Sequence, residues 1–196
     1  RQGDDHRNPR LYRTRRGHRR AGGRDGAAAA LSARLRRDLG LPLGHPAALI
    51  ATGFGLGLLP LAPGSWAALA ALPAAWAIRA LGGIGGLAAA VVLALAAGWW
   101  AAGRVAQASG RGDPGAIVID EIAAQWLVLL VAPRDPWSYA AAFALFRLFD
   151  ITKVWPASWV DRRLHGGHGI MLDDVVAALY AMMLLWIGEG VLGVRS

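Results

Sequence analysis

Residues 80–103 read ALGGIGGLAAAVVLALAAGWWAAG and contain no Asp, Glu, Lys or Arg. About 20 apolar residues in an α-helix are enough to cross the hydrocarbon core of a bilayer. The stretch nears its end with Trp99 and Trp100, and tryptophan favours the interface between membrane and water. This segment therefore predicts a transmembrane helix.

The segment before it is just as apolar. From Leu41 to Ile78 the chain has no acidic residue, lysine or arginine, and His45 is its only ionisable side chain. Glycines and prolines between Gly53 and Gly64 interrupt this run, so we expect two apolar helices on either side of an irregular segment. Irregular backbone at membrane depth must be covered by protein or line a cavity, which makes this segment a candidate site.

The remainder of the chain predicts more helices. Apolar stretches at 117–132, 137–153 and 171–192 each predict one, with a water-exposed loop at 104–116 and a polar connection at 157–169. The 196 residues are 55% hydrophobic and only 17% charged, against about 25% charged in average soluble domains. We find no repeat, no strand-like alternation and no heptad run. The predicted fold is all-α, a compact bundle of about six helices, several of them membrane-embedded.

The net charge of +8 lies entirely in the first 38 residues, which contain 12 arginines. An Arg-rich arm can bind nucleic acid, but Tyr12 is its only aromatic residue, and contact with anionic lipid is the better explanation. A solvated extension without a function is equally compatible with the sequence. We expect a disordered cytoplasmic tail at 1–38 and a helical membrane domain at 39–196, with the tail oriented by the positive-inside bias.

Five carboxylates stand out in the otherwise apolar segments: Asp120, Glu121, Asp150, Asp173 and Asp174. An acid near a helix N-terminus is stabilised by the helix dipole, which explains Asp173 but not Asp150, predicted near a C-terminus. Ionisable residues in apolar segments are costly and usually mark a functional site. Clustered carboxylates in a chain without cysteine suit Mg²⁺ rather than Zn²⁺.

Basic residues accompany one of these carboxylates. Arg147, Asp150 and Lys153 are spaced i, i+3 and i+6, close to one helical face, where the basic groups can offset the carboxylate and hold a phosphate. The glycines of the irregular segment allow backbone N–H groups to approach an anion. His165 and His168 have no third ligand at matching spacing, so a structural or exposed role is favoured for both.

Four segments in this order resemble the phosphatidylglycerophosphatase A family. They are TGFGLGLLPLAPGS at 52–65, DPGAIVIDEI at 113–122 continuing to Gln125 and Trp126, FRLFDITK at 146–153, and GGHGIMLDD at 166–174. The similarity covers roughly residues 45–190 and leaves out the tail. The chain departs from the family pattern at Ser65, Ala67, Ala124, Val154 and His168, and none of these departures removes a carboxylate.

The resemblance implies an all-helical, membrane-bound, Mg²⁺-dependent hydrolase of phospholipid biosynthesis. Its substrate would be phosphatidylglycerophosphate, whose terminal phosphomonoester is cleaved to give phosphatidylglycerol. We expect a multi-pass protein of the bacterial inner membrane with its active site facing the cytoplasm. The expected catalytic residues are Asp120, Glu121, Asp150, Lys153, Asp173 and Asp174, with metal ligands among Asp120, Glu121, Asp150 and Asp174. The expected phosphate-binding residues are Arg147, Lys153, Thr52, Gly53, Gly55, Gly64 and Ser65.

Other mechanisms fit the sequence less well. The absence of cysteine excludes cysteine phosphatases, and the Asp-x-Asp-x-Thr motif of haloacid-dehalogenase-type phosphatases does not occur. The remaining rival is a non-enzymatic membrane protein, such as a small transporter or assembly factor with buried carboxylates. A transporter would more often show repeated halves, and none is visible. The sequence does not identify the carboxylate that acts as general base, and it leaves open direct attack by an Asp to give an acyl phosphate.

Overall fold

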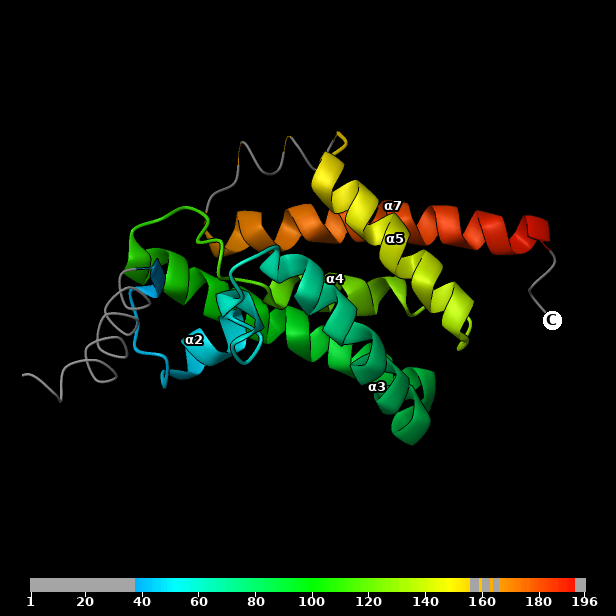
Figure 1. Ribbon diagram of the computed structural model, residues 1–196, viewed down its shortest axis with the longest axis horizontal. Helices are drawn as coiled ribbons and strands as arrows, with labels where there is room; N and C mark the ends of the chain where they lie inside the picture. The colour runs from blue at the N-terminus through cyan, green and yellow to red at the C-terminus, as the bar shows by residue number, and fades with distance from the viewer. Residues whose placement is uncertain (1–37, 156–158, 160–162, 164–165, 193–196) are drawn as a thin grey trace, which may run out of the picture. The chain divides into compact units, whose positions relative to one another are not determined.

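The structure, a computed structural model, describes residues 38–155, 159, 163 and 166–192. All regular secondary structure in these residues is helical, which confirms the all-α prediction (Figure 1). The elements are α2 (Pro46–Ala51), the short 3-10 helix η2 (Leu56–Leu58), α3 (Pro63–Ser109), α4 (Ile119–Val128), α5 (Pro136–Thr152) and α7 (Gly167–Leu192). The predicted tail, apart from Asp38, lies outside the described residues, and so does His165.

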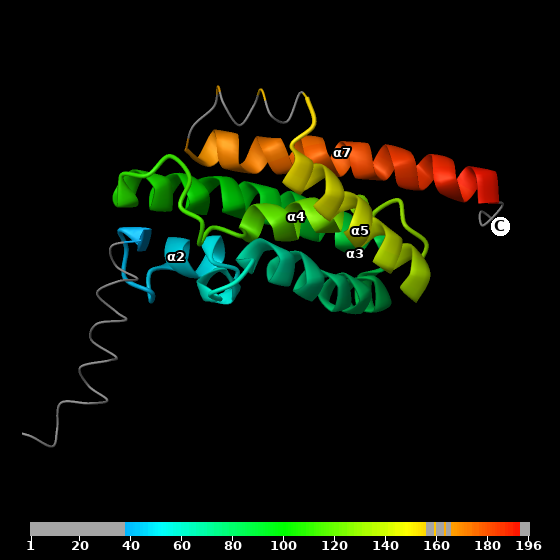
Figure 2. The same cartoon turned by 45° about the horizontal axis from the view of Figure 1, so that its top comes forward.

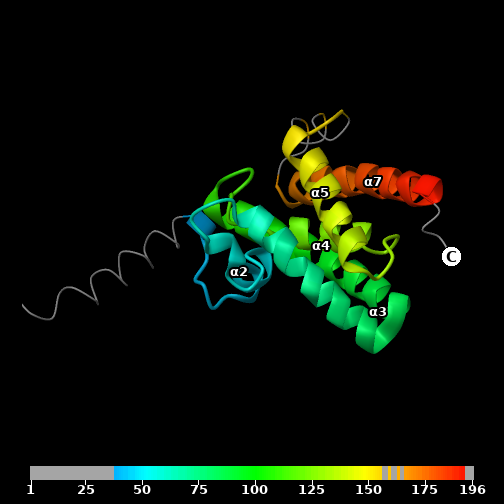
Figure 3. The same cartoon turned by 45° about the vertical axis from the view of Figure 1, so that its right-hand side comes forward.

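Helix α3 is two helices joined at Gly83. This residue has φ 62° and ψ −161°, a combination that essentially only glycine adopts, and the chain reverses direction there (Figure 3). The prediction of one helix over 80–103 is therefore wrong at its start. The second half of α3 also continues to Ser109, into the stretch predicted as a loop from residue 104. Four glycines stand between residues 82 and 86, and their pattern did not indicate which one breaks the helix.

Helix α4 lies at the centre of the packing. It contacts α3, α5 and α7, and these neighbours surround it in Figures 1 and 2. One group of buried side chains joins α2, the second half of α3 and the start of α4, around Ala101 and Val105. A second group joins the first half of α3, the end of α4, α5 and α7, around Phe146. Because α4 belongs to both groups, its first turn is held from several sides.

The outer surface of α3 and α7 is apolar. Both helices are long and apolar enough to cross a membrane, and only 17% of the most apolar window of α3 is buried in the protein. The core helix of a soluble protein would be mostly covered. Here Leu81, Val92, Leu93 and Leu179 are exposed. These features agree with a membrane protein.

Helix α7 begins earlier than the sequence predicted. It starts at Gly167 rather than at residue 171, so Asp173 and Asp174 lie in its second turn. The stabilisation of an acid by the helix dipole falls off beyond the first turn, and it therefore does not account for Asp173. The start of α7 packs closely on α3, because a Cβ atom at Gly167 would lie 2.6 Å from the backbone nitrogen of Gly103. This close crossing places the second turn of α7 beside α4.

Candidate active site

Four helices meet around a polar cavity of about 260 Å³. The N-terminus of α3, the first turn of α4, the C-terminus of α5 and the second turn of α7 all contribute to its wall, together with the loop before α4. Its lining residues are Ala62, Pro63, Gly64, Asp113, Gly115, Ile117, Asp120, Glu121, Arg147, Asp150, Lys153, Ile170, Asp173 and Asp174. All six of the predicted catalytic residues are therefore brought together.

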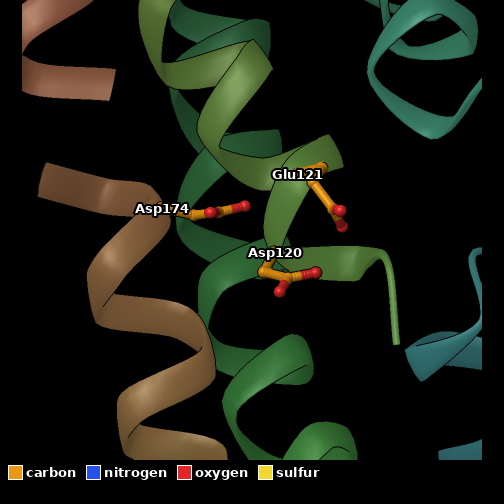
Figure 4. A group of neighbouring side chains, drawn as sticks. All are labelled: Asp120, Glu121 and Asp174. Atoms are coloured by element: carbon orange, nitrogen blue, oxygen red, sulfur yellow. The ribbon is translucent and has the colours of Figure 1, made fainter. Parts of the chain in front are cut away.

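Three carboxylates form the innermost group of this cavity. Asp120 and Glu121 come from α4, and Asp174 points toward them from α7 (Figure 4). One oxygen of each lies within 4.8 Å of the others. Each carboxylate also has one buried oxygen without a hydrogen-bond partner: Asp120 Oδ1, Glu121 Oε2 and Asp174 Oδ2. Buried oxygens of this kind are costly unless a donor or a cation satisfies them.

Burial also changes the protonation of the two carboxylates on α4. It raises the pKa of Asp120 well above its ordinary value, and repulsion from Glu121 and Asp174 raises that pKa further. Burial likewise raises the pKa of Glu121. Without a nearby positive charge, the group therefore resists full ionisation. A bound cation reverses this effect, because it favours the ionised carboxylates.

The acidic group fits a divalent metal ion. Its donors are carboxylate oxygens, which hard cations such as Mg²⁺ prefer, and each of the three carboxylates has a buried oxygen that no hydrogen bond satisfies. Asp150, the fourth predicted ligand, lines the same cavity but is not part of this group. Its Oδ2 forms an ion pair with Nη1 of Arg147.

The two basic residues of the cavity are each bound to an acid. Arg147 pairs with Asp150, and Nζ of Lys153 lies 2.9 Å from Oδ2 of Asp173. Lys153 ends α5 in a left-handed conformation with φ 44°, so it leaves the helical path on which the i, i+6 spacing was predicted. Both still line the cavity. The side chain of Lys153 is 36% exposed and that of Arg147 only 16%, which places Lys153 nearer the solvent.

The first turn of α3 closes the cavity beside Glu121. A Cβ atom at Gly64 would overlap Oε1 of Glu121, so only glycine lets the helix approach this carboxylate. Ala62 and Pro63, at the start of the same helix, also line the cavity. The positive end of the α3 dipole therefore faces an acidic site.

The other predicted phosphate-binding residues lie outside the cavity lining. Thr52 is buried, and its Oγ1 donates to the carbonyl of Ala48 at 2.8 Å and accepts from the N–H of Gly55 at 3.2 Å. Gly53 packs against Ile122 of α4. Gly55 belongs to the same loop, and Ser65 lies one residue beyond the lining. In this structure the loop that contains Gly53 and Gly55 packs against α4. The phosphate-binding role of these residues stays a prediction.

Asp113 is a cavity residue to which the sequence analysis gave no role. It belongs to the loop between α3 and α4, in the segment DPGAIVIDEI, and lines the cavity with Gly115. The acidic side chain of Asp113 in that segment is the feature of the sequence that could have indicated a role in the site. His168 is exposed and lies outside the lining, with its ring edge-on to Trp99 at a centroid distance of 4.9 Å.

Comparison with known proteins identifies the family. The family model described as phosphatidylglycerophosphatase A matches residues 49–189. The chain belongs to the phosphatidylglycerophosphatase A family. It is 37% identical over 154 residues to phosphatidylglycerophosphatase A of Escherichia coli K12, covering 74% of this chain and 85% of that protein. The phosphatidylglycerophosphatase A of Haemophilus influenzae Rd is 38% identical over 143 residues, covering 72% and 88%.

A third relative has a different name. A protein of Bacteroides thetaiotaomicron, provisionally named as a phosphatidylinositol-3-phosphatase, is 40% identical over 152 residues, covering 74% of this chain and 94% of that protein. No solved structure matches the chain.

Every residue of the cavity lining lies inside the part matched to the phosphatidylglycerophosphatase A family. The family places the chain among phosphoric monoester hydrolases, which confirms the prediction of an enzyme. It does not favour the alternative of a non-enzymatic transporter or assembly factor.

The contact between Gly64 and Glu121 can be tested by substitution. Gly64→Ala should lower kcat/KM for phosphate release about 10²-fold, because the new methyl group displaces the Glu121 carboxylate by about 1 Å or more. Gly115→Ala is the matched control, since residue 115 also lines the cavity but has no atom within 4 Å of a Cβ position. Equal activity of the two variants would show that the position of Glu121 is unimportant.

Proposed function

We propose that this protein is a Mg²⁺-dependent phosphatidylglycerophosphatase, which hydrolyses the terminal phosphomonoester of phosphatidylglycerophosphate to phosphatidylglycerol and phosphate. The observation that carries the proposal is the convergence, beside Arg147 and Lys153, of three carboxylates that each have a buried oxygen without a hydrogen bond. Family membership and the names of the two phosphatidylglycerophosphatase A relatives support the same substrate.

The charge of the cavity supports a metal requirement. Among the described residues, six acidic side chains line it, against two basic ones, and both basic side chains are already ion-paired. A phosphomonoester dianion would be repelled by such a site. Cations are therefore needed to bind the substrate as well as to promote its hydrolysis, and Asp120, Glu121 and Asp174 would hold one. When bound, Mg²⁺ supplies charge neutralisation at the phosphate and orients water.

The residues of the chain account for the remaining requirements of phosphoryl transfer, which are positioning and charge stabilisation. Arg147 offers a planar fork of donors to the phosphate oxygens and Lys153 a point charge. Asp150 and Asp173 hold these two side chains in place through their ion pairs. In the reaction, the oxygen of a water bonds to phosphorus while the ester P–O bond breaks. One cavity carboxylate takes the proton of the water, and the lipid glycerol oxygen leaves and becomes protonated.

The membrane arrangement follows from the apolar helices. In this proposal the two halves of α3 and helix α7 cross the bacterial inner membrane, so the protein is multi-pass. The acyl chains of the substrate stay in the bilayer while its headgroup reaches the cavity. The Arg-rich residues 1–38 place the N-terminus, and with it the active site, on the cytoplasmic side. The partners are the lipid substrate and the bilayer, and no nucleic acid.

The proposal is tested by phosphate release from purified protein in mixed micelles, with and without Mg²⁺. Phosphatidylglycerophosphate should be hydrolysed, and EDTA or Asp120→Asn should abolish the release. Phosphatidylinositol 3-phosphate is the informative competing substrate. It also carries a phosphomonoester, and the Bacteroides relative is provisionally named as a phosphatase of this kind of lipid. A clear preference for this competitor, or activity that EDTA leaves unchanged, would contradict the proposal.

Lys153 provides a second test. If its ammonium group binds the phosphate, Lys153→Met should lower kcat/KM about 10²–10³-fold, the usual cost of removing one charge-stabilising donor. Lys153→Arg should lose less, since it keeps the charge. The control is Arg104→Met, which removes an exposed positive charge outside the cavity lining and should change the rate little. A loss below about fivefold for Lys153→Met would exclude the phosphate-binding role.

A further inference from the structure

Gln125 has a buried amide that packing does not explain. It lies on α4, one helical turn after Glu121, and its side chain is fully buried. Neither Nε2 nor Oε1 has a hydrogen-bond partner in the described structure. A buried amide without partners destabilises a fold, and an apolar side chain of the same size would be tolerated better. The presence of an amide at this position therefore suggests a function that an apolar side chain could not provide.

One oxygen of the Glu121 carboxylate lacks a hydrogen-bond donor, whereas the amide of Gln125 lacks an acceptor. Oε2 of Glu121 is a buried acceptor without a donor, and Nε2 of Gln125 is a buried donor without an acceptor. Residues four apart on a helix have Cβ atoms about 5–6 Å from each other, so their side chains can meet on one face. The other oxygen of Glu121, Oε1, lies against the backbone of Gly64. Gly64 thus leaves room for this carboxylate on one side, and Gln125 can support it at Oε2.

We propose that Gln125 is a positioning residue for the metal site. Its amide N–H donates a hydrogen bond to Oε2 of Glu121, directly or through one buried water molecule, and fixes the direction in which this carboxylate faces the cation. The proposal rests on the metal-dependent function proposed above. Partners that orient a metal-binding carboxylate in this way are commonly worth about 10–100-fold in metal affinity or activity.

Two other buried donors of the described residues lack partners, Nε of Arg147 and the hydroxyl group of Tyr139. Arg147 already binds Asp150 through Nη1 and lines the cavity, so the proposed phosphate contact accounts for it. The ring of Tyr139 packs edge-on against Trp76, at a centroid distance of 5.2 Å, in the core shared by α3 and α5. Gln125 is the one of the three that shares a helix, one turn apart, with a carboxylate of the acidic group formed by Asp120, Glu121 and Asp174.

The test compares Gln125→Met with the parent protein in detergent. Thermal unfolding measured over a range of Mg²⁺ concentrations reports metal binding without any substrate, because a ligand of the folded state raises Tm. Gln125→Met should stay folded without Mg²⁺, because methionine fills nearly the same volume and removes Oε1, an acceptor without a partner. It should need about tenfold more Mg²⁺ for the same rise in Tm and for half-maximal kcat. Gln125→Asn, which keeps the amide on a shorter stem, should lie between Gln125→Met and the parent.

Trp126→Phe is the matched control. It changes the next residue of α4 and removes a hydrogen bond of 2.9 Å from Nε1 of Trp126 to the carbonyl of Ala71, away from the acidic group. It should lower Tm at every Mg²⁺ concentration and leave the Mg²⁺ requirement unchanged. A parent-like Mg²⁺ requirement in Gln125→Met and Gln125→Asn would overturn the positioning role alone. A parent with neither a Mg²⁺-dependent Tm nor Mg²⁺-dependent activity would instead overturn the proposed function on which it rests.

Discussion

Repulsion among carboxylates buried in a dry helical bundle is the constraint on which this structure depends. Asp120, Glu121 and Asp174 are held close together by helices that otherwise contribute mostly apolar side chains. Their desolvation and mutual repulsion oppose folding unless positive charge is added. In the described part of the chain, the positive charges that line the cavity are those of Arg147 and Lys153, which are paired with Asp150 and Asp173. A cation at the centre, as proposed above, would link metal binding to the stability of the folded site.

The rest of the architecture holds this costly group in place. The reversal within α3 brings its two halves together, α4 is packed on three sides, and the glycine crossing between α7 and α3 sets the position of Asp174. The glycine-rich loop after α2 supports the segment that leads into α4, where the N–H of Val118 donates to the carbonyl of Ala51 at 2.8 Å. Rigid placement matters because a small displacement of a metal-binding carboxylate weakens both binding and catalysis.

Much of this could be predicted from the sequence, because charges in apolar segments are conspicuous. The helical class, the five carboxylates and the two basic residues were found in this way, and the cavity contains all seven. The turn at Gly83 could not be located, since neighbouring glycines are equally able to adopt its conformation. The phosphate-binding role of the glycines near Thr52 stays a prediction. The packing of Gly53 against α4 was not predicted, because it depends on tertiary contacts that spacing does not reveal. Asp113 was missed because a single acid in a loop carries no periodic signal.

The central claim, that the buried carboxylates hold a divalent cation, is tested most directly by measuring binding of Mn²⁺ as a paramagnetic substitute for Mg²⁺. Electron paramagnetic resonance of the free aqua ion gives the affinity of purified protein without any turnover. The parent and Asp135→Asn, a variant in the N-cap of α5 outside the cavity, should bind Mn²⁺ equally. Asp174→Asn, folded to the same extent, should bind it at least about tenfold more weakly. Equal Mn²⁺ affinity in the parent and in Asp174→Asn would contradict the account.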